Sequence, residues 1–313
     1  MNPHLQRAFD QENQIWKYFI VIFLVLFISQ TIGALPLLIT ILVSVQQIGE
    51  SYVKSENYLD FSAYGIDPNL GLVLMLIPFL VMLFLSVFLI KTLHKRSLMD
   101  VINGGRSFRW SRFMVGFFTW GIIIFATIIF SVFFNQDNYK IQFSVREFVP
   151  LVIISFIMLS LQSGSEEFLF RGYLVQGIAA RTGSSFWVIV ISSTLFAVVH
   201  GLNPEVKEFG FWLAIPLYFL FGAILAIITI MDNGIEMAIG FHSANNVLSA
   251  IFITSKSSVL QTPALFYEKE THFADQYWNF LLAALLFLLM IKMFYGWNFK
   301  KLMKPIREVE NAA

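Results

Sequence analysis

Long apolar runs dominate this sequence and decide what it can fold into. A helix needs about 20 mostly apolar residues to cross the roughly 30 Å of hydrocarbon in a bilayer. Eight runs come close to or exceed that length, at residues 17–45, 69–91, 113–134, 148–172, 185–202, 211–231, 234–254 and 277–296. Because 57% of the chain is apolar and only 13% is charged, a soluble globular protein is excluded. The sequence predicts an all-α, polytopic membrane protein with about eight transmembrane helices.

The charged loops predict how the chain is oriented. Basic residues gather between the second and third runs and in the C-terminal tail, namely Lys91, Lys95, Arg96, Arg106, Arg109, Arg112, Lys300, Lys301, Lys304 and Arg307. The loops at 48–68 and 255–276 are acidic or balanced. Since short cytoplasmic loops are rich in Lys and Arg, we expect both termini to be cytoplasmic in a multi-pass protein of the cell membrane. The first run is too long for a signal-peptide core, and we interpret it as a retained span bent at Pro36.

Composition also limits the chemistry. The chain has no cysteine, which excludes disulfides and thiolate catalysis. Its formal net charge is +1 and it shows no basic-aromatic pattern, so no nucleic-acid partner is expected. The partners that the sequence indicates are the lipid bilayer and whatever its polar intramembrane residues bind.

A few polar side chains interrupt the apolar runs, where a charge costs several kcal/mol unless it is paired. They are Glu166, Glu167 and Arg171 in the fourth run, His200 in the fifth, and His242 and Asn246 in the seventh. Such residues are functional candidates by default. The other histidines, His4, His94 and His272, lie in polar segments, and we interpret them as surface residues.

Helical spacing sorts these candidates. Glu167 and Arg171 are four residues apart, so they share a helix face and can form an ion pair, whereas Glu166 points about 100° away. An antiparallel hairpin turning at Gly183 would bring Glu166 and His200 to the same depth. His242 and Asn246 also share a face. The competing structural interpretation is a buried ion-pair knot for Glu167 and Arg171, with Asn246 bonding a neighbouring helix.

Two kinds of chemistry fit this set of side chains. A carboxylate, two imidazoles and an amide can activate water and stabilise an oxyanion, as peptide hydrolysis requires. Alternatively, Glu166, His200 and His242 could bind zinc with an open coordination position. The sequence contains no H-E-x-x-H helix, so the common zincin arrangement is absent, and no G-x-S-x-G elbow, so a serine nucleophile is not indicated.

Three motifs resemble those of the CAAX protease and bacteriocin-processing family, also called Abi. They are Glu166-Glu167-x-x-x-Arg171, Phe196-x-x-x-His200 and His242-x-x-x-Asn246. Each is weak alone, but the three stand in the family's order on three apolar runs, and the likeness covers roughly residues 148–250. Eight spans also suit the prenyl-protein endopeptidase branch. The resemblance implies a protease core at 148–256, an N-terminal membrane region at 1–147, and a last span with a basic tail at 257–313.

What the resemblance implies is an intramembrane endopeptidase that cleaves membrane-associated or lipidated peptides and proteins. Glu166 and His200 would activate water, and His242 and Asn246 would stabilise the oxyanion. The family is described both as metal-dependent and as glutamate-type without metal; the missing zinc motif favours the metal-free form, with zinc as the alternative cofactor bound by Glu166, His200 and His242. Glu167, Arg171 and Phe196 would support the site. Family members also act as non-proteolytic regulatory or bacteriocin-immunity partners, which is the alternative function. A proton-coupled transporter fits less well, since no internal repeat is evident, and a purely structural membrane protein would leave the His242–Asn246 pair unexplained.

Overall fold

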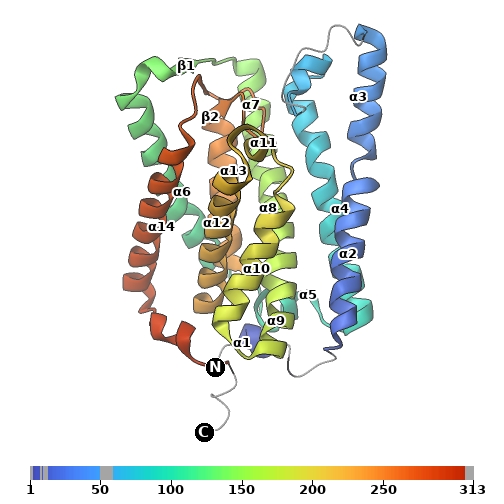
Figure 1. Cartoon of the computed structure of the whole chain (residues 1–313), viewed down its shortest axis with the longest axis vertical. Coiled ribbons are helices and arrows are strands. Elements are labelled where there is room, and N and C mark those ends of the chain that lie inside the picture. Colours follow the sequence, from blue (N-terminus) through green and yellow to red (C-terminus); the bar gives the residue numbers. More distant parts are fainter. Residues whose placement is uncertain (1–2, 8, 10–12, 50–58, 307–313) are drawn as a thin grey trace.

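The computed structural model describes residues 3–7, 9, 13–49 and 59–306. These form one bundle of helices that run along a common axis (Figure 1). The first described helix, α1 (Pro3–Gln6), and the last described turn, η6 (Phe299–Met303), lie at the same end of the bundle, the lower end in Figure 1. The all-α polytopic fold predicted from the apolar runs is confirmed.

Among the described residues, six helical stretches are long and apolar enough to cross a membrane: Ile15–Ile48, Pro68–His94, Trp110–Phe134, Val145–Thr182, Phe211–Asp232 and Phe273–Tyr295. The last two are α12 and α14, and the second and third are α4 and α6. The remaining two predicted spans correspond to α10 (Ser185–Val199) and α13 (Glu236–Phe252), which have 15 and 17 residues. At 1.5 Å per residue both fall short of a full crossing, although both lie within the bundle.

The first span is broken where proline predicted a bend. Helix α2 (Ile15–Thr31) ends before Gly33, and α3 (Leu35–Ile48) begins with Pro36 in its first turn. Proline is favoured there because the first helical N–H groups have no partner within the helix. The predicted bend is therefore confirmed as a helix break.

The fourth span is longer than predicted. It runs as α7 (Val145–Ile154), the π-helical turn η4 (Ser155–Leu159), α8 (Ser160–Glu167), a second π-helical turn η5 (Phe168–Leu174), and α9 (Val175–Thr182). The predicted end at residue 172 is wrong, because the helix goes on burying side chains such as Val175 and Ala179 against its neighbours. It stops at Gly183, whose φ of 60° caps the helix in the left-handed conformation.

Two glycines let the helix that carries His242 and Asn246 pack closely. Gly240 of α13 lies against the backbone of Phe113, and Gly116 of α6 lies against the backbone of Met237. A Cβ atom at either position would overlap those backbone atoms. Next to this crossing, the buried Trp120 ring stacks on Phe241, with ring centroids 3.9 Å apart. Small residues at a crossing are a common means of packing membrane helices, and here they fix the place of α13.

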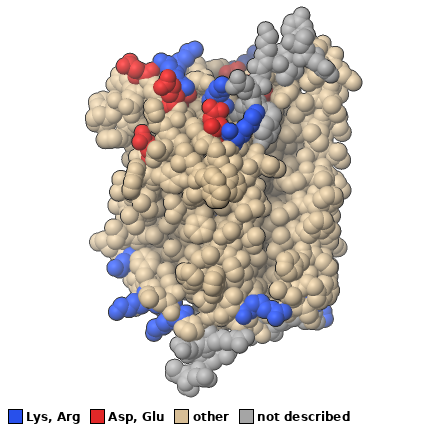
Figure 2. Space-filling model, viewed as in Figure 1, with Lys and Arg blue, Asp and Glu red and all other residues tan. Residues whose placement is uncertain are grey.

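Short elements close both ends of the bundle. At the upper end in Figure 1, β1 (Tyr139–Ile141) pairs antiparallel with β3 (Phe266–Glu268), which pairs parallel with β2 (Ile253–Ser255). Helix α11 (Pro204–Phe209) and the turns η2 (Phe61–Tyr64) and η3 (Gln136–Asn138) complete the short elements, with α5 (Leu98–Asn103) between α4 and α6. On the face shown in Figure 2, only Lys and Arg mark the lower end, whereas charges of both signs mark the upper end.

Two of the three histidines assigned to the surface are buried, so that prediction was wrong for them. His4 and His94 are both 0% exposed. His94, in the last turn of α4, lies 2.7 Å from the Tyr173 hydroxyl, and His4 lies beneath η5. His272 is exposed, as predicted. The polar loop residues 50–58 and Arg307, which entered the orientation argument, lie outside the described residues.

Candidate active site

The centre of the site is an ion pair buried within the fourth span. Arg171 Nη1 lies 3.2 Å from Glu167 Oε1, and both side chains are fully buried. Arg171 Nη2 also donates to the backbone oxygen of Gly222 in α12, at 3.1 Å. The guanidinium carbon stands 4.2 Å from the centre of the Phe196 ring. The predicted pairing of Glu167 with Arg171 is confirmed, and Phe196 supports it by covering the cation.

His242 contacts both glutamates. Its Nδ1 lies 2.9 Å from Glu167 Oε1, and its Nε2 lies 3.6 Å from Glu166 Oε2. A glutamate paired with arginine accepts hydrogen bonds, so Nδ1 carries the hydrogen and donates it. Although Glu166 and Glu167 point in different directions along the helix, the imidazole ring is wide enough to place one nitrogen near each. Glu167 thus fixes the orientation of the histidine.

Glu166 has fewer close polar contacts than Glu167. The 3.6 Å separation from His242 Nε2 is longer than a hydrogen bond. Within the described part of the chain, Glu166 Oε2 accepts no hydrogen bond, although it is buried. Its side chain keeps 8% of its surface exposed, whereas Glu167 keeps none. An acceptor in this position is available to a water molecule or a substrate.

Asn246 lies one helical turn beyond His242 in α13, and both side chains face α8. Its Nδ2 lies 2.9 Å from Gln162 Oε1 and 3.4 Å from Ser163 Oγ, both in α8. His242 and Asn246 therefore share a face, as predicted, and that face meets α8. Gln162 and Ser163 were not singled out from the sequence. They could have been found from the polar run that directly precedes Glu166, because residue 162 lies one helical turn before residue 166.

The hairpin that should carry His200 is present. Helix α9 ends at Thr182 and α10 starts at Ser185, and the Phe170 and Phe196 rings meet at 5.5 Å, as a turn centred on Gly183 requires. His200 follows the last residue of α10, and its Nδ1 lies 2.7 Å from the backbone oxygen of Phe196. A carbonyl only accepts, so Nδ1 donates and Nε2 is the free acceptor in the neutral ring.

His200 packs between aromatic rings. Its centroid is 4.4 Å from that of Phe196 and 4.6 Å from that of Tyr218 in α12, on which it stacks at 28°. The Tyr218 hydroxyl accepts from Asn203 Nδ2 at 2.8 Å and lies 3.3 Å from Glu205 Oε2. Within the described residues no hydrogen bond joins His200 to Glu166. His200 is held by Phe196 and Tyr218, whereas Glu166 lies near His242. Tyr218 was missed because a tyrosine in an apolar run gives no distinct sequence signal.

The alternative zinc set is not assembled in this arrangement. Among the residues that the structure describes, no three His, Cys, Asp or Glu side chains converge in a way that could hold a metal ion. Of the three predicted ligands, Glu166 and His242 lie together, while His200 is turned toward Phe196 and Tyr218. These side chains do not fit a zinc site as they stand, and the chemistry below is derived from the chain's own groups.

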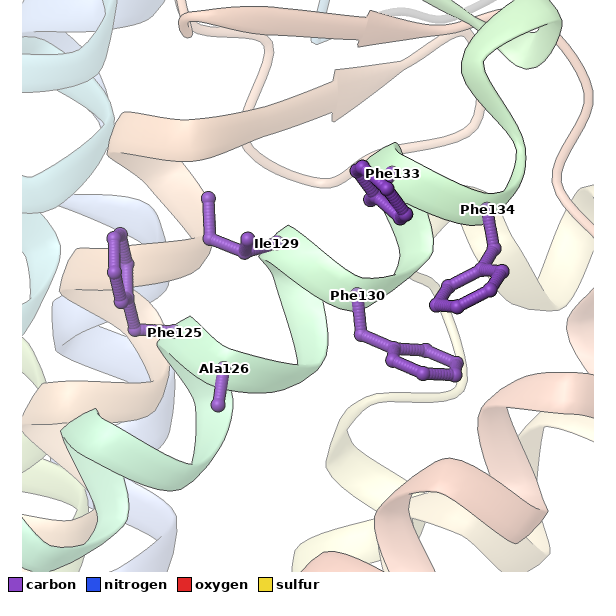
Figure 3. A pocket seen from close by; sticks show the side chains of 6 residues that line it. All are labelled: Phe125, Ala126, Ile129, Phe130, Phe133 and Phe134. Carbon is purple, nitrogen blue, oxygen red and sulfur yellow. The ribbon is translucent and has the colours of Figure 1, made fainter.

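A groove elsewhere on the surface has a different character. It is lined by apolar residues of α6 alone: Phe125, Ala126, Ile129, Phe130, Phe133 and Phe134. In Figure 3 the labelled side chains project from helix α6. One of them, Phe125, packs edge-on against Phe252, with ring centroids 5.2 Å apart. Exposed phenylalanines on a membrane-spanning helix suit contact with lipid chains. The groove shares no residue with the Glu166 site and offers no polar group for chemistry.

Comparison with known proteins identifies the part of the chain that holds this site. The family model described as type II CAAX prenyl endopeptidase Rce1-like matches residues 147–248. This segment is similar to the CAAX prenyl endopeptidase family. It contains the Glu166, Phe196–His200 and His242–Asn246 motifs, so the resemblance predicted from them is confirmed. The similarity to this family supports a CAAX-type protease activity on a peptide or protein substrate within the lipid bilayer.

One curated protein covers most of the chain. The uncharacterized protein YyaK of Bacillus subtilis (strain 168) is 29% identical over 263 residues, which are 83% of this chain and 85% of that protein. The similarity therefore extends beyond the family segment on at least one side. No solved structure matches the chain.

Proposed function

We propose that this protein is an intramembrane endopeptidase in which Glu166 activates water. The observation that carries the proposal is the unequal state of the two adjacent glutamates. Glu167 is fully buried and its Oε1 is held by Arg171 and by His242 Nδ1, whereas the Glu166 side chain keeps 8% of its surface exposed and has no arginine partner among the described residues. The Oε2 atom of each glutamate accepts no hydrogen bond from the described residues. A general base must be able to take a proton from water, and Glu166, which is not paired with Arg171 and is partly exposed, meets that condition better than Glu167.

The first step uses acceptors from two helices. Water that binds at Glu166 Oε2 loses a proton to that carboxylate as its oxygen forms a bond to the substrate carbonyl carbon. His200, whose Nδ1 hydrogen is committed to the Phe196 carbonyl, offers Nε2 as a second acceptor to orient the water. The carbonyl π electrons move to oxygen and give a tetrahedral oxyanion.

The oxyanion is stabilised from α13. In this proposal His242 carries a proton on both nitrogens before the substrate binds, the second one taken from solvent, and it keeps that proton throughout the cycle. Nδ1 then stays on Glu167 Oε1 while Nε2 donates to the oxyanion. Asn246 Nδ2 adds a second donor by exchanging one of its contacts with Gln162 or Ser163. One such donor contributes about 3–4 kcal/mol in other proteases. The intermediate then collapses, the C–N bond breaks, and the leaving nitrogen takes the proton from Glu166.

The substrate we propose is a membrane-associated or lipidated peptide segment that reaches the site from the cytoplasm. The basic loop before α6 contacts the end of the bundle at which α12 ends and α13 begins, which is the end nearer His242. There Arg109 forms ion pairs with Asp232 and Glu236. Under the positive-inside rule this end is cytoplasmic. Both termini would then face the cytoplasm of a cell that carries the protein in its cell membrane.

The test is cleavage of a quenched peptide library, with lipidated and unlipidated members, by purified protein. Glu166→Gln should abolish cleavage, while Glu208→Gln, an exposed glutamate of α11, should leave it unchanged. Activity that survives a chelator supports the water mechanism. Activity that is lost on chelation and restored by zinc would overturn it in favour of a metalloprotease. If the wild type cuts no peptide and Glu166→Gln retains the cellular phenotype, a regulatory role replaces proteolysis.

A further inference from the structure

Helix α1 (Pro3–Gln6) is built into the core beneath the site. His4 and Leu5 are both 0% exposed, and Leu5 packs in the same apolar cluster as Val101 and Val175. Gly104 of the adjoining turn lies so near the backbone of Pro3 that a Cβ atom would stand 2.5 Å from its carbonyl oxygen. The chain therefore keeps this short helix tightly seated rather than loosely attached.

Side-chain hydrogen bonds fasten α1 to two neighbouring elements. Gln176 of α9 donates through Nε2 to the backbone oxygen of His4 at 2.9 Å and to that of Asp100 at 2.8 Å. Arg96 holds the other end of the Gln176 amide, with Nη1 3.1 Å from Oε1. Arg7 Nε donates to Asp100 Oδ1 at 2.7 Å. The Gln176 bonds set the position of His4 with respect to the helix that carries Glu166, and the Arg7–Asp100 pair adds to the docking of α1.

The His4 ring meets that helix at one backbone atom. His4 Nε2 lies 2.9 Å from the backbone oxygen of Arg171, within the π-helical turn η5. Because a carbonyl only accepts, Nε2 donates. Burial lowers the pKa of His4 to about 4, so the ring is neutral at neutral pH and has this one hydrogen to give. π-Helical turns often stand at functional sites, and here the turn carries the site's arginine.

We propose that His4 is a positioning residue of the active site. It holds the backbone of Arg171, whose side chain bonds Glu167 Oε1 at 3.2 Å, and the same oxygen holds His242 Nδ1 at 2.9 Å. The path from His4 to His242 thus has two intermediates, and a shift of the Arg171 backbone moves the oxygen that orients the histidine. This inference rests on the proposed function.

The test compares three single variants of the full-length protein with the wild type. His4→Leu removes the hydrogen bond, His4→Gln retains an N–H donor, and Arg7→Ala weakens the docking of α1 without touching the His4 bond. We expect His4→Leu to lower kcat about 10- to 100-fold with little change in KM, as for residues that hold a reacting group through another. His4→Gln should recover most of that loss, and Arg7→Ala should retain wild-type kcat. Activities are compared per molecule of folded protein, scored by thermal unfolding in detergent.

A second readout separates this inference from the proposed function. In protein labelled with ¹⁵N-histidine, His4→Leu should shift the ring resonances of His242, while Arg7→Ala should not. A shift without cleavage by the wild type means that the proposed function fails and the positioning role stands. Unchanged kcat and unchanged His242 resonances in a folded His4→Leu protein would overturn the inference. So would equal losses in His4→Leu and Arg7→Ala, because docking of α1 in general would then explain the effect.

Discussion

The buried pair of Glu167 and Arg171 allows a quantitative test of how this chain keeps charges inside a membrane protein. Substituting Arg171 by Met leaves the Glu167 carboxylate, which is fully buried, with His242 Nδ1 as its described hydrogen-bond donor. Removing one partner of a buried ion pair costs about 3–5 kcal/mol, because the remaining charge is uncompensated. Glu167→Gln leaves the Arg171 cation with the Gly222 oxygen and the Phe196 ring, and should cost a similar amount.

The double variant Glu167→Gln/Arg171→Met leaves no buried charge from this pair. Its loss of stability should therefore be smaller than the sum of the two single losses, by about 2–3 kcal/mol, near the upper end for coupled neighbours. The assay is reversible unfolding of the purified protein by SDS in mixed micelles. It yields a free energy of unfolding for each of the four proteins of this double-mutant cycle: the wild type, the two single variants and the double variant. The pair Arg7–Asp100 is the control, since its side chains are 37% and 9% exposed. Its cycle should give a coupling below about 1 kcal/mol.

Additive losses in the Glu167–Arg171 cycle, within about 0.5 kcal/mol, would refute the reasoning. They would mean that the two charges do not neutralise each other and that each is stabilised by other groups. A coupling as large at Arg7–Asp100 would also count against it, because burial would then not be what makes the pair strong.

Three further outcomes are expected. Tyr218→Phe keeps the ring that stacks on His200 and should retain most activity, whereas Tyr218→Ala should lower kcat about tenfold or more; equal effects would show that the stack does not matter. The pKa of His4 is about 4 in the folded protein against an ordinary 6.5, so the unfolded chain binds the extra proton between these values. The free energy of unfolding should accordingly fall by up to about 3 kcal/mol as the pH drops through that range. In His4→Gln the midpoint temperature of thermal unfolding should depend less on pH over the same range. Because the chain has no cysteine, Glu270→Cys should react with an impermeant maleimide on intact cells and Lys301→Cys only after permeabilisation; the reverse pattern would invert the proposed orientation.

Local sequence pattern predicted the parts of this protein that depend on neighbours along the chain. Apolar runs located the membrane helices, Pro36 marked the break between α2 and α3, and Gly183 marked the hairpin turn. The spacing of Glu167 and Arg171 predicted their ion pair, since residues four apart on a helix are adjacent in space whatever surrounds them. The short terminal sheet carried no comparable signal, because its strands have three residues each.

Contacts between distant segments were decided only by the tertiary structure. The spacing argument kept Glu166 and Glu167 apart, yet packing of α13 brings one imidazole, from His242, to both of them. His200 stands beside Tyr218 because α10 ends one residue before it and α12 passes alongside. His4 looked like a surface residue in a polar segment and is buried, 167 positions from the carbonyl that it contacts. Sequence periodicity fixes which face of a helix a side chain occupies, whereas the partner of that face depends on how the helices pack.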